Sequence, residues 1–107
     1  MQGSTAPIKG SLPENTFDAM FIGTSQKINT SGTSQQSSAV GSTCSLVRIK
    51  ASEDCYIAIG ADPTASATTC HVWSGIVEYF AIKAGDKVAV IQDTDAGILY
   101  ITEGATR

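Results

Sequence analysis

The stretch Cys44-Ser45-Leu46-Val47-Arg48-Ile49-Lys50 alternates apolar and polar side chains near its end. Successive side chains of a β-strand point to opposite faces, so Val47 and Ile49 would share one face while Arg48 and Lys50 share the other. This period of two predicts a strand that is buried on one face and solvated on the other.

Further short apolar runs follow, and residues that favour turns (Gly, Asp, Pro and Ser) separate them. Together the runs predict strands near 45–50, 55–60, 69–73, 76–82, 87–92 and 98–103. The fold class that we expect is therefore all-β, a small antiparallel β-sandwich of jelly-roll-like or immunoglobulin-like form. Because the last four runs are joined by short connections, we expect them to form an antiparallel meander. The side chains expected in the core are Val47, Ile49, Ile57, Ile59, Phe80, Val88, Val90 and Leu99.

Residues 1–22 are mixed in composition, and Pro7 and Pro13 interrupt them. Proline fits the first position of a helix, so a short helical turn near Pro13-Glu14-Asn15 is one interpretation. A short strand around 19–23 is the other, and the sequence leaves both open.

Residues 23–43 are rich in Ser, Thr, Gln and Gly and contain few apolar side chains. Such a segment cannot bury enough surface to offset the entropy that it loses on ordering. It is either a flexible linker or an extended strand that lies on another subunit, and we expect the second. The predicted organisation is an extended polar N-terminal arm at 1–43 and a β-sandwich domain at 44–107.

Charge and composition restrict the partners. Of the 107 residues 16% are charged, and the net charge is −3. Globular chains ordinarily have about 25% charged residues, so we expect a partner to cover part of the surface. The few basic residues give no electrostatic basis for binding nucleic acid. No apolar run has the length of a membrane span and no secretory signal begins the chain, so we expect no membrane association and synthesis in a cytosol.

The cysteines and the single histidine were the first candidates for chemistry. Cys44, Cys55 and Cys70 are odd in number and lack Cys-x-x-Cys spacing, so three buried thiols are expected in place of a disulfide or a zinc site. Cys70 and His71 are adjacent, and on a strand they would point to opposite faces, which argues against one shared metal. We therefore expect no metal and no cofactor, with His71 exposed or at an interface.

Asp93-x-Asp95-x-Gly97 begins like a calcium-binding loop. An EF-hand would need a glutamate at the twelfth position, where Gly104 stands, so a hairpin turn is the prediction. A nucleophile would need a base and an orienting acid, and the chain has neither a Gly-x-Ser-x-Gly elbow nor a phosphate-binding loop. We expect that the protein is not an enzyme.

Several short motifs carry a resemblance. They are Val47-Arg48-Ile49, Cys55-Tyr56-Ile57-Ala58-Ile59-Gly60, Pro63-Thr64-Ala65, Val77-Glu78-Tyr79-Phe80, Gly85-Asp86-Lys87-Val88-Ala89-Val90-Ile91 and the C-terminal Leu99-Tyr100-Ile101-Thr102-Glu103. In these motifs and their order, residues 44–107 resemble small virion proteins encoded among the head genes of tailed bacteriophages.

The resemblance implies a β-sandwich virion protein that acts as a capsid cement or decoration protein. It implies the major capsid protein as partner, self-association as a homodimer or homotrimer, and a place on the capsid exterior after synthesis in the host bacterial cytoplasm. It carries over no catalytic residue.

Two alternatives remain at this point. One is a component of a phage tail or head fibre. The other is a glycan-binding β-sandwich, because Tyr56, Trp73, Tyr79 and Tyr100 could form a sugar-stacking face, although aromatic side chains on strands more often pack in the core. If the polar segment docks on a partner strand, the expected contact residues are Ile28, Gln35, Gln36, Val40 and His71.

Overall fold

A computed structural model describes residues 20–105. The regular secondary structure of this part of the chain consists of β-strands, which confirms the all-β prediction. The strands are β1 (Phe21–Asn29), β2 (Gln35–Gln36), β3 (Leu46–Ala51), β4 (Cys55–Gly60), β5 (Cys70–Val72), β6 (Glu78–Ala81), β7 (Lys87–Gln92) and β8 (Ile98–Ala105). Within the described residues there is no helix that could cross a membrane.

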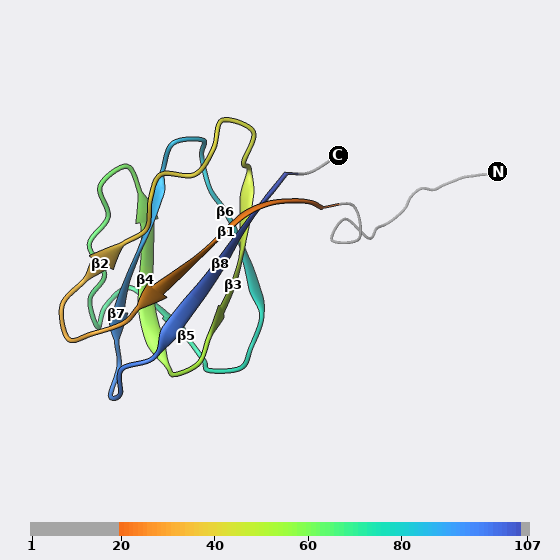
Figure 1. The fold of residues 1–107 in the computed structure, drawn as a ribbon. Coiled ribbons are helices and arrows are strands. Elements are labelled where there is room, and N and C mark those ends of the chain that lie inside the picture. The colour runs from red at the N-terminus through yellow and green to blue at the C-terminus, as the bar shows by residue number, and fades with distance from the viewer. Residues whose placement is uncertain (1–19, 106–107) are drawn as a thin grey trace.

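The strands form two antiparallel sheets that face each other (Figure 1). Sheet 1 has the order β1-β8-β3-β6 and sheet 2 has the order β2-β7-β4-β5. Consecutive strands alternate between the sheets, except that β4 and β5 pair within sheet 2. This order is that of a jelly roll, so the β-sandwich prediction is confirmed.

The predicted meander of the last four strands is wrong. β5 and β7 belong to sheet 2, whereas β6 and β8 belong to sheet 1. Packed sheets lie only about 10 Å apart, and an extended segment as long as 93–97 can reach about 16 Å. A short connection can therefore cross between sheets as easily as it can form a hairpin, and 93–97 is such a crossing in place of the predicted hairpin turn.

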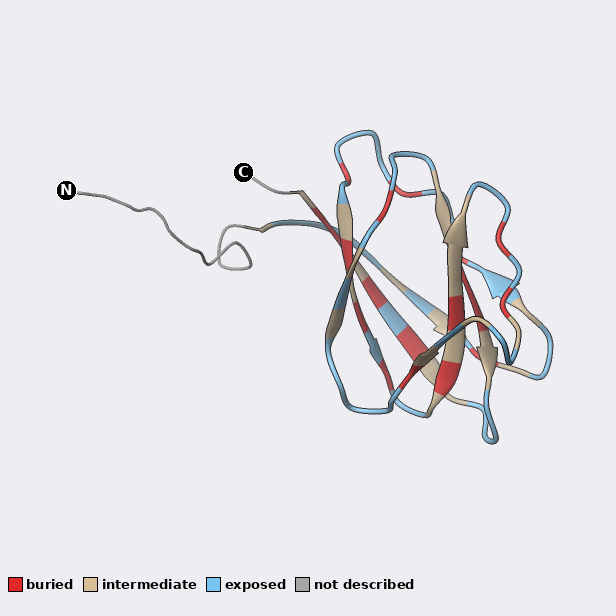
Figure 2. Cartoon of the chain, turned by 180° about the vertical axis from the view of Figure 1, so that it is seen from behind, coloured by how far each residue is buried: buried red, intermediate tan, exposed pale blue. Residues whose placement is uncertain are grey.

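The core lies between the sheets, and Figure 2 shows buried residues as red segments along the strands. Six of the eight predicted core residues are buried, and Ile59 and Phe80 are partly buried against them. The alternation that predicted β3 appears directly in its burial, since Val47, Ile49 and Ala51 are buried while Arg48 and Lys50 are not. The six predicted strands coincide with β3 to β8 to within a few residues at their ends.

Residues 23–43, expected to lie on another subunit, are part of the sandwich. They include most of β1, which pairs with β8 along the edge of sheet 1, and β2, which pairs with β7 along the edge of sheet 2. The described sandwich therefore begins at Phe21, not at Cys44. The expectations for the helical turn at Pro13 and for the arm up to residue 19 fall outside the described residues.

Hydrogen bonds to distant parts of the chain order this polar segment. The Thr30 amide donates to the Gly97 carbonyl at 2.9 Å, and the Gly97 amide donates to Thr30 Oγ1 at 2.7 Å. The Val88 amide donates to Ser37 Oγ at 2.9 Å. Gln26 bridges the two sheet edges, because its side chain accepts from the Ser38 amide and donates to the Ser38 carbonyl. The Ser, Thr and Gln side chains that predicted an arm thus connect the segment to the rest of the sandwich.

The three cysteines are free thiols, but they do not share one environment. Cys44 and Cys55 are buried as expected, whereas Cys70 is exposed on the edge strand β5, so the prediction of three buried thiols is wrong for Cys70. Burial, and next the charge of Asp54, raises the pKa of the Cys55 thiol to about 11. The Cys55 thiol is therefore protonated and unreactive at neutral pH.

Candidate functional site

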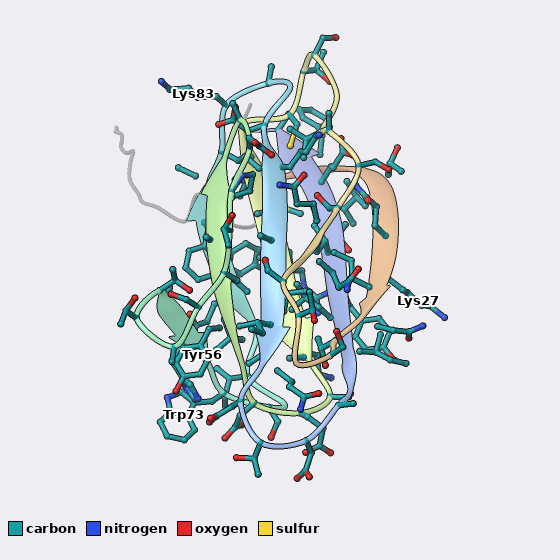
Figure 3. The ribbon with its side chains drawn as sticks, turned by 90° about the vertical axis from the view of Figure 1, so that its left-hand side faces the viewer. Lys27, Tyr56, Trp73 and Lys83 are labelled. Atoms are coloured by element: carbon teal, nitrogen blue, oxygen red, sulfur yellow. The ribbon has the colours of Figure 1, made fainter. Side chains whose placement is uncertain are left out.

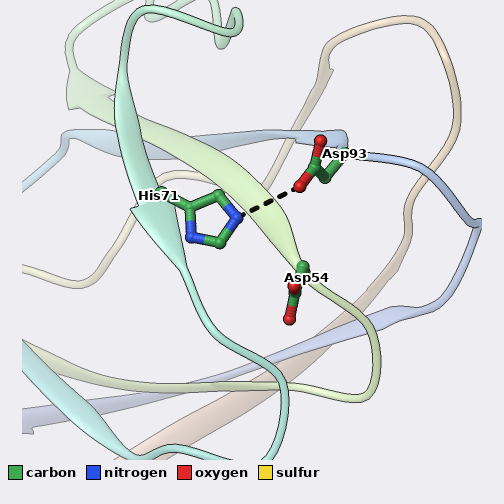
Figure 4. A group of neighbouring side chains, drawn as sticks. All are labelled: Asp54, His71 and Asp93. Atoms are coloured by element: carbon green, nitrogen blue, oxygen red, sulfur yellow. Dashed lines mark hydrogen bonds and ion pairs between the residues drawn. The ribbon is translucent and has the colours of Figure 1, made fainter.

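One candidate site lies on the outer face of sheet 2. We call Asp54, His71 and Asp93 the His71 cluster (Figure 4). Asp54 immediately precedes β4, His71 lies in β5, and Asp93 immediately follows β7. Because β4 pairs with both β5 and β7, these three positions meet at one end of the sheet.

The groups of the His71 cluster are close and ordered. His71 Nε2 lies 3.2 Å from Asp93 Oδ2, and the potential ligand atoms of all three residues lie within 4.8 Å of one another. The Ser74 amide donates to Asp54 Oδ1 at 2.8 Å, and the Asp93 amide donates to the Asp54 carbonyl at 3.2 Å. The turns that carry the two carboxylates are thereby joined to each other and to the β5–β6 connection.

Two aromatic side chains flank the imidazole. Tyr56 is the cross-strand partner of His71, and its ring packs edge-on with centroids 4.9 Å apart. The Trp73 ring lies 4.4 Å away, also edge-on, and Trp73 is 61% exposed. His71 Nδ1 is buried without a hydrogen-bond partner, so Nε2 is the ring nitrogen that faces the carboxylates.

A second candidate site is a hollow of about 740 Å³ on the outer face of sheet 1. In the strand register, Lys27 and Lys50 flank Tyr100, and Ser25 and Arg48 flank Thr102 in the next row. All of these residues line the hollow, and no Asp or Glu does. Lys27 Nζ lies 5.9 Å from the centroid of the Tyr100 ring. We call this the basic hollow, and its chemistry suits an anionic group on a partner.

The two candidate sites are on the outer faces of different sheets. Figure 3 shows Lys27 at one side of the sandwich and Tyr56 and Trp73 at the other. The basic hollow extends from Lys27 to Ser74, whose amide donates to Asp54, so the two sites adjoin at the β5–β6 connection.

The third feature is the start of the edge strand β1. Phe21 is 60% exposed and Ile22 is 76% exposed. The register shifts between Ile22 and Ser25, so that Gly23 and Thr24 stand opposite the single residue Glu103. Such a bulge bends an edge strand and redirects its side chains, and here it directly follows the two exposed apolar residues.

The five residues predicted to contact a partner have different environments. Val40 is 4% exposed and belongs to the core, and Ile28 is partly buried against it, so neither presents a contact surface in the described chain. Gln35 and Gln36 are exposed on the edge strand β2, where the side-chain Nε2 of Gln36 donates to Asp62 Oδ1 and to the Pro63 carbonyl. His71 is partly exposed within its cluster.

Sequence reasoning missed the two carboxylates beside His71. It considered Cys70 as a ligand beside His71 and argued against it, because adjacent strand residues point to opposite faces. The register agrees with that argument, since Cys70 pairs with inward-facing Ile57 and His71 pairs with Tyr56. It also expected the aromatic residues to be buried, yet Trp73, Tyr79 and Tyr100 are exposed. The available signal was that Asp54 and Asp93 each adjoin a predicted strand end.

Comparison with protein-family models, with curated proteins and with solved structures finds no match for this chain. Function is therefore inferred from the geometry above and from the resemblance of residues 44–107.

Proposed function

We propose that this protein is a capsid cement protein that attaches to the outside of an assembled phage head through sheet 1 and its edge strand β1. It acts by binding, without catalysis, and its partners are the major capsid protein and further copies of itself. The alternative within the same class is a tail or head-fibre component, which would use the same surface on a different target.

The observation that carries the proposal is the exposed pair Phe21 and Ile22 at the start of β1. As successive residues of a strand they point to opposite faces, so a partner strand along the edge of β1 would contact both, and exposed large apolar side chains are a feature of interaction sites. The outer edge of β1 has no neighbouring strand within the described sheet, so a strand of a partner could pair with it by β-augmentation. Backbone pairing would give affinity, and the two apolar side chains would add buried area.

The basic hollow supports attachment through the same sheet. Lys27 lies on β1 itself, and Arg48 and Lys50 lie two strands away on β3. The net charge of the chain is −3, so these three side chains form a positively charged patch on a protein that is negative overall. An acidic partner surface would therefore approach this side of the sandwich in preference to the others.

A second function has one observation in its favour. Trp73 is strongly exposed beside Tyr56 and two carboxylates, and an exposed ring next to hydrogen-bonding carboxylates is suited to stacking on a sugar. A glycan-binding module would use sheet 2, whereas the cement function would use sheet 1. Variants of the two faces therefore separate the two functions.

The test is cosedimentation of the purified protein with phage heads that lack it. The double variant Phe21→Ser with Ile22→Ser removes the apolar pair. Full burial of each side chain contributes about 1.5–3 kcal/mol, and 1.4 kcal/mol corresponds to tenfold in affinity. We expect the double variant to bind at least 100-fold more weakly than the unmodified protein.

The matched control is Ile76→Ser, which removes an apolar side chain of similar exposure from the β5–β6 connection. It should bind within about twofold of the unmodified protein. Equal binding by the double variant would contradict attachment through β1, and failure of the unmodified protein to bind any head would contradict the cement function itself. Trp73→Ala should change binding to immobilised glycans only if the second function is correct.

A further inference from the structure

We propose that Asp54, His71 and Asp93 bind one divalent transition-metal ion at the end of sheet 2, with Zn²⁺ as the ion that their donor atoms fit. The inference does not rest on the cement function, because none of the three residues lines the basic hollow or belongs to β1.

The donor set selects the class of ion. Zn²⁺ takes imidazole nitrogen and carboxylate oxygen at about 2.0–2.2 Å. Calcium takes about six to eight oxygen ligands, and the His71 cluster offers two carboxylates and a nitrogen. One imidazole with two carboxylates is thus better matched to a transition metal than to Ca²⁺.

The distances are compatible with a shared ion. Two ligands that each bind at about 2.1 Å in a tetrahedral or octahedral arrangement lie about 3.0–3.4 Å apart. His71 Nε2 and Asp93 Oδ2 are 3.2 Å apart, within that interval. The potential ligand atoms span no more than 4.8 Å, so a side-chain rotation of Asp54 would be enough to complete the set.

The imidazole is held in the orientation that ligation needs. Tyr56 and Trp73 pack against its ring and restrict its rotation. Nε2 points toward the carboxylate of Asp93, as Figure 4 shows. Binding at Nε2 would therefore require little loss of side-chain freedom from His71.

The charge of the cluster also favours a cation. Two carboxylates lie within a few ångströms of each other, and among residues 20–105 the His71–Asp93 contact is the ion pair that the structure shows. Within residues 20–105, neither Asp54 nor Asp93 forms a salt bridge with Lys or Arg. A divalent ion would compensate both carboxylates at once, and it would connect the start of β4, the strand β5 and the end of β7.

The experiment uses the full chain without an affinity tag, freed of metal with a chelator and titrated with ZnCl₂ in a calorimeter. We expect one Zn²⁺ per chain and a thermal midpoint that rises by roughly 10 °C at a hundredfold excess over the dissociation constant. His71 is the single histidine of the chain, so the imidazole NMR signals report this site alone, and Zn²⁺ should shift them.

The variants His71→Gln and Asp93→Asn should each bind Zn²⁺ at least tenfold more weakly. Asp95→Asn is the matched control, because it makes the same change of charge in the same turn outside the cluster, and it should bind within about twofold. Cys70→Ser should also bind normally. Far-ultraviolet spectra and urea midpoints establish that each variant is folded.

Four results would overturn the proposal. The first is the absence of Zn²⁺ binding at millimolar concentration, and the second is unchanged Zn²⁺ affinity in folded Asp93→Asn. The third is an equal loss of Zn²⁺ affinity in Asp95→Asn, which would indicate diffuse attraction by acidic residues. The fourth is a loss of Zn²⁺ affinity in Cys70→Ser. Tighter binding of Ca²⁺ than of Zn²⁺ would likewise overturn the assignment of the ion.

Discussion

Truncating the chain at two places tests whether the polar segment belongs to the sandwich. The variant 20–107 keeps every described strand, whereas the variant 41–107 loses β1 and β2. We expect the first to unfold like the full chain and the second to be unfolded or poorly cooperative. An independent arm, as the composition suggested, would allow the second variant to fold.

The magnitude follows from what the longer deletion removes. Ile28 packs against the core and Val40 is buried in it, and burial of such side chains contributes about 1.5–3 kcal/mol each, or about 3–6 kcal/mol together. The hydrogen bonds of Thr30 to the β7–β8 connection and of Ser37 to β7 are lost as well, at about 0.5–1.5 kcal/mol each. A domain of this size has a total stability of about 4–13 kcal/mol, so the loss is comparable to the whole.

The assay is urea unfolding followed by far-ultraviolet circular dichroism. The variant 20–107 should have the midpoint and slope of the full chain, and it serves as the control for truncation as such. A cooperative transition of 41–107 near the midpoint of the full chain would refute the reasoning, because it would mean that β1 and β2 contribute little to the free energy of unfolding.

Three further predictions concern the core and the thiols. Ile57→Ala should lower the free energy of unfolding by roughly 2–5 kcal/mol, because Ile57 is 1% exposed. Ile76→Ala at the surface should change the free energy of unfolding by less than about 0.5 kcal/mol. Equal effects in urea unfolding would mean that the faces of β4 are misassigned. In the native protein at pH 8, Cys70 should react with a thiol reagent before Cys44 and Cys55, and all three should react after denaturation. Because the folded state keeps the Cys55 proton up to about pH 11 while the unfolded chain loses it near pH 9, stability should fall across that interval, and Cys55→Ala should lack this part of the fall. A parallel fall in the variant would contradict the pKa assignment.

The candidate sites could be predicted only in part. The sequence identified His71 and the aromatic residues as worth testing, but it associated His71 with its neighbour Cys70. Asp54 and Asp93 join His71 because β4 pairs with β5 on one side and with β7 on the other, and these pairings depend on contacts between residues far apart in the chain. In the same way, Lys27 and Lys50 meet beside Tyr100 because β8 lies between β1 and β3.

The local pattern was sufficient for β3 to β8 and for most of the core. Alternation of side chains is a property of adjacent residues, so Val47, Ile49, Val88 and Val90 were correctly assigned to the inner faces from the sequence. The polar segment was wrongly assigned for the opposite reason. Its ordering depends on partners such as Gly97 for Thr30 and Val88 for Ser37, and no local pattern shows that these hydrogen bonds will form.

The assignment of each strand to a sheet was decided by tertiary packing. A short connection permits either a hairpin or a crossing, and the difference between them lies in which faces become buried together. β6 and β7 show this clearly, because they are neighbours in the sequence and belong to different sheets. Burial of both inner faces in a single core stabilises the jelly-roll arrangement as a whole, and that free energy belongs to the complete set of strands and to no single stretch of the chain.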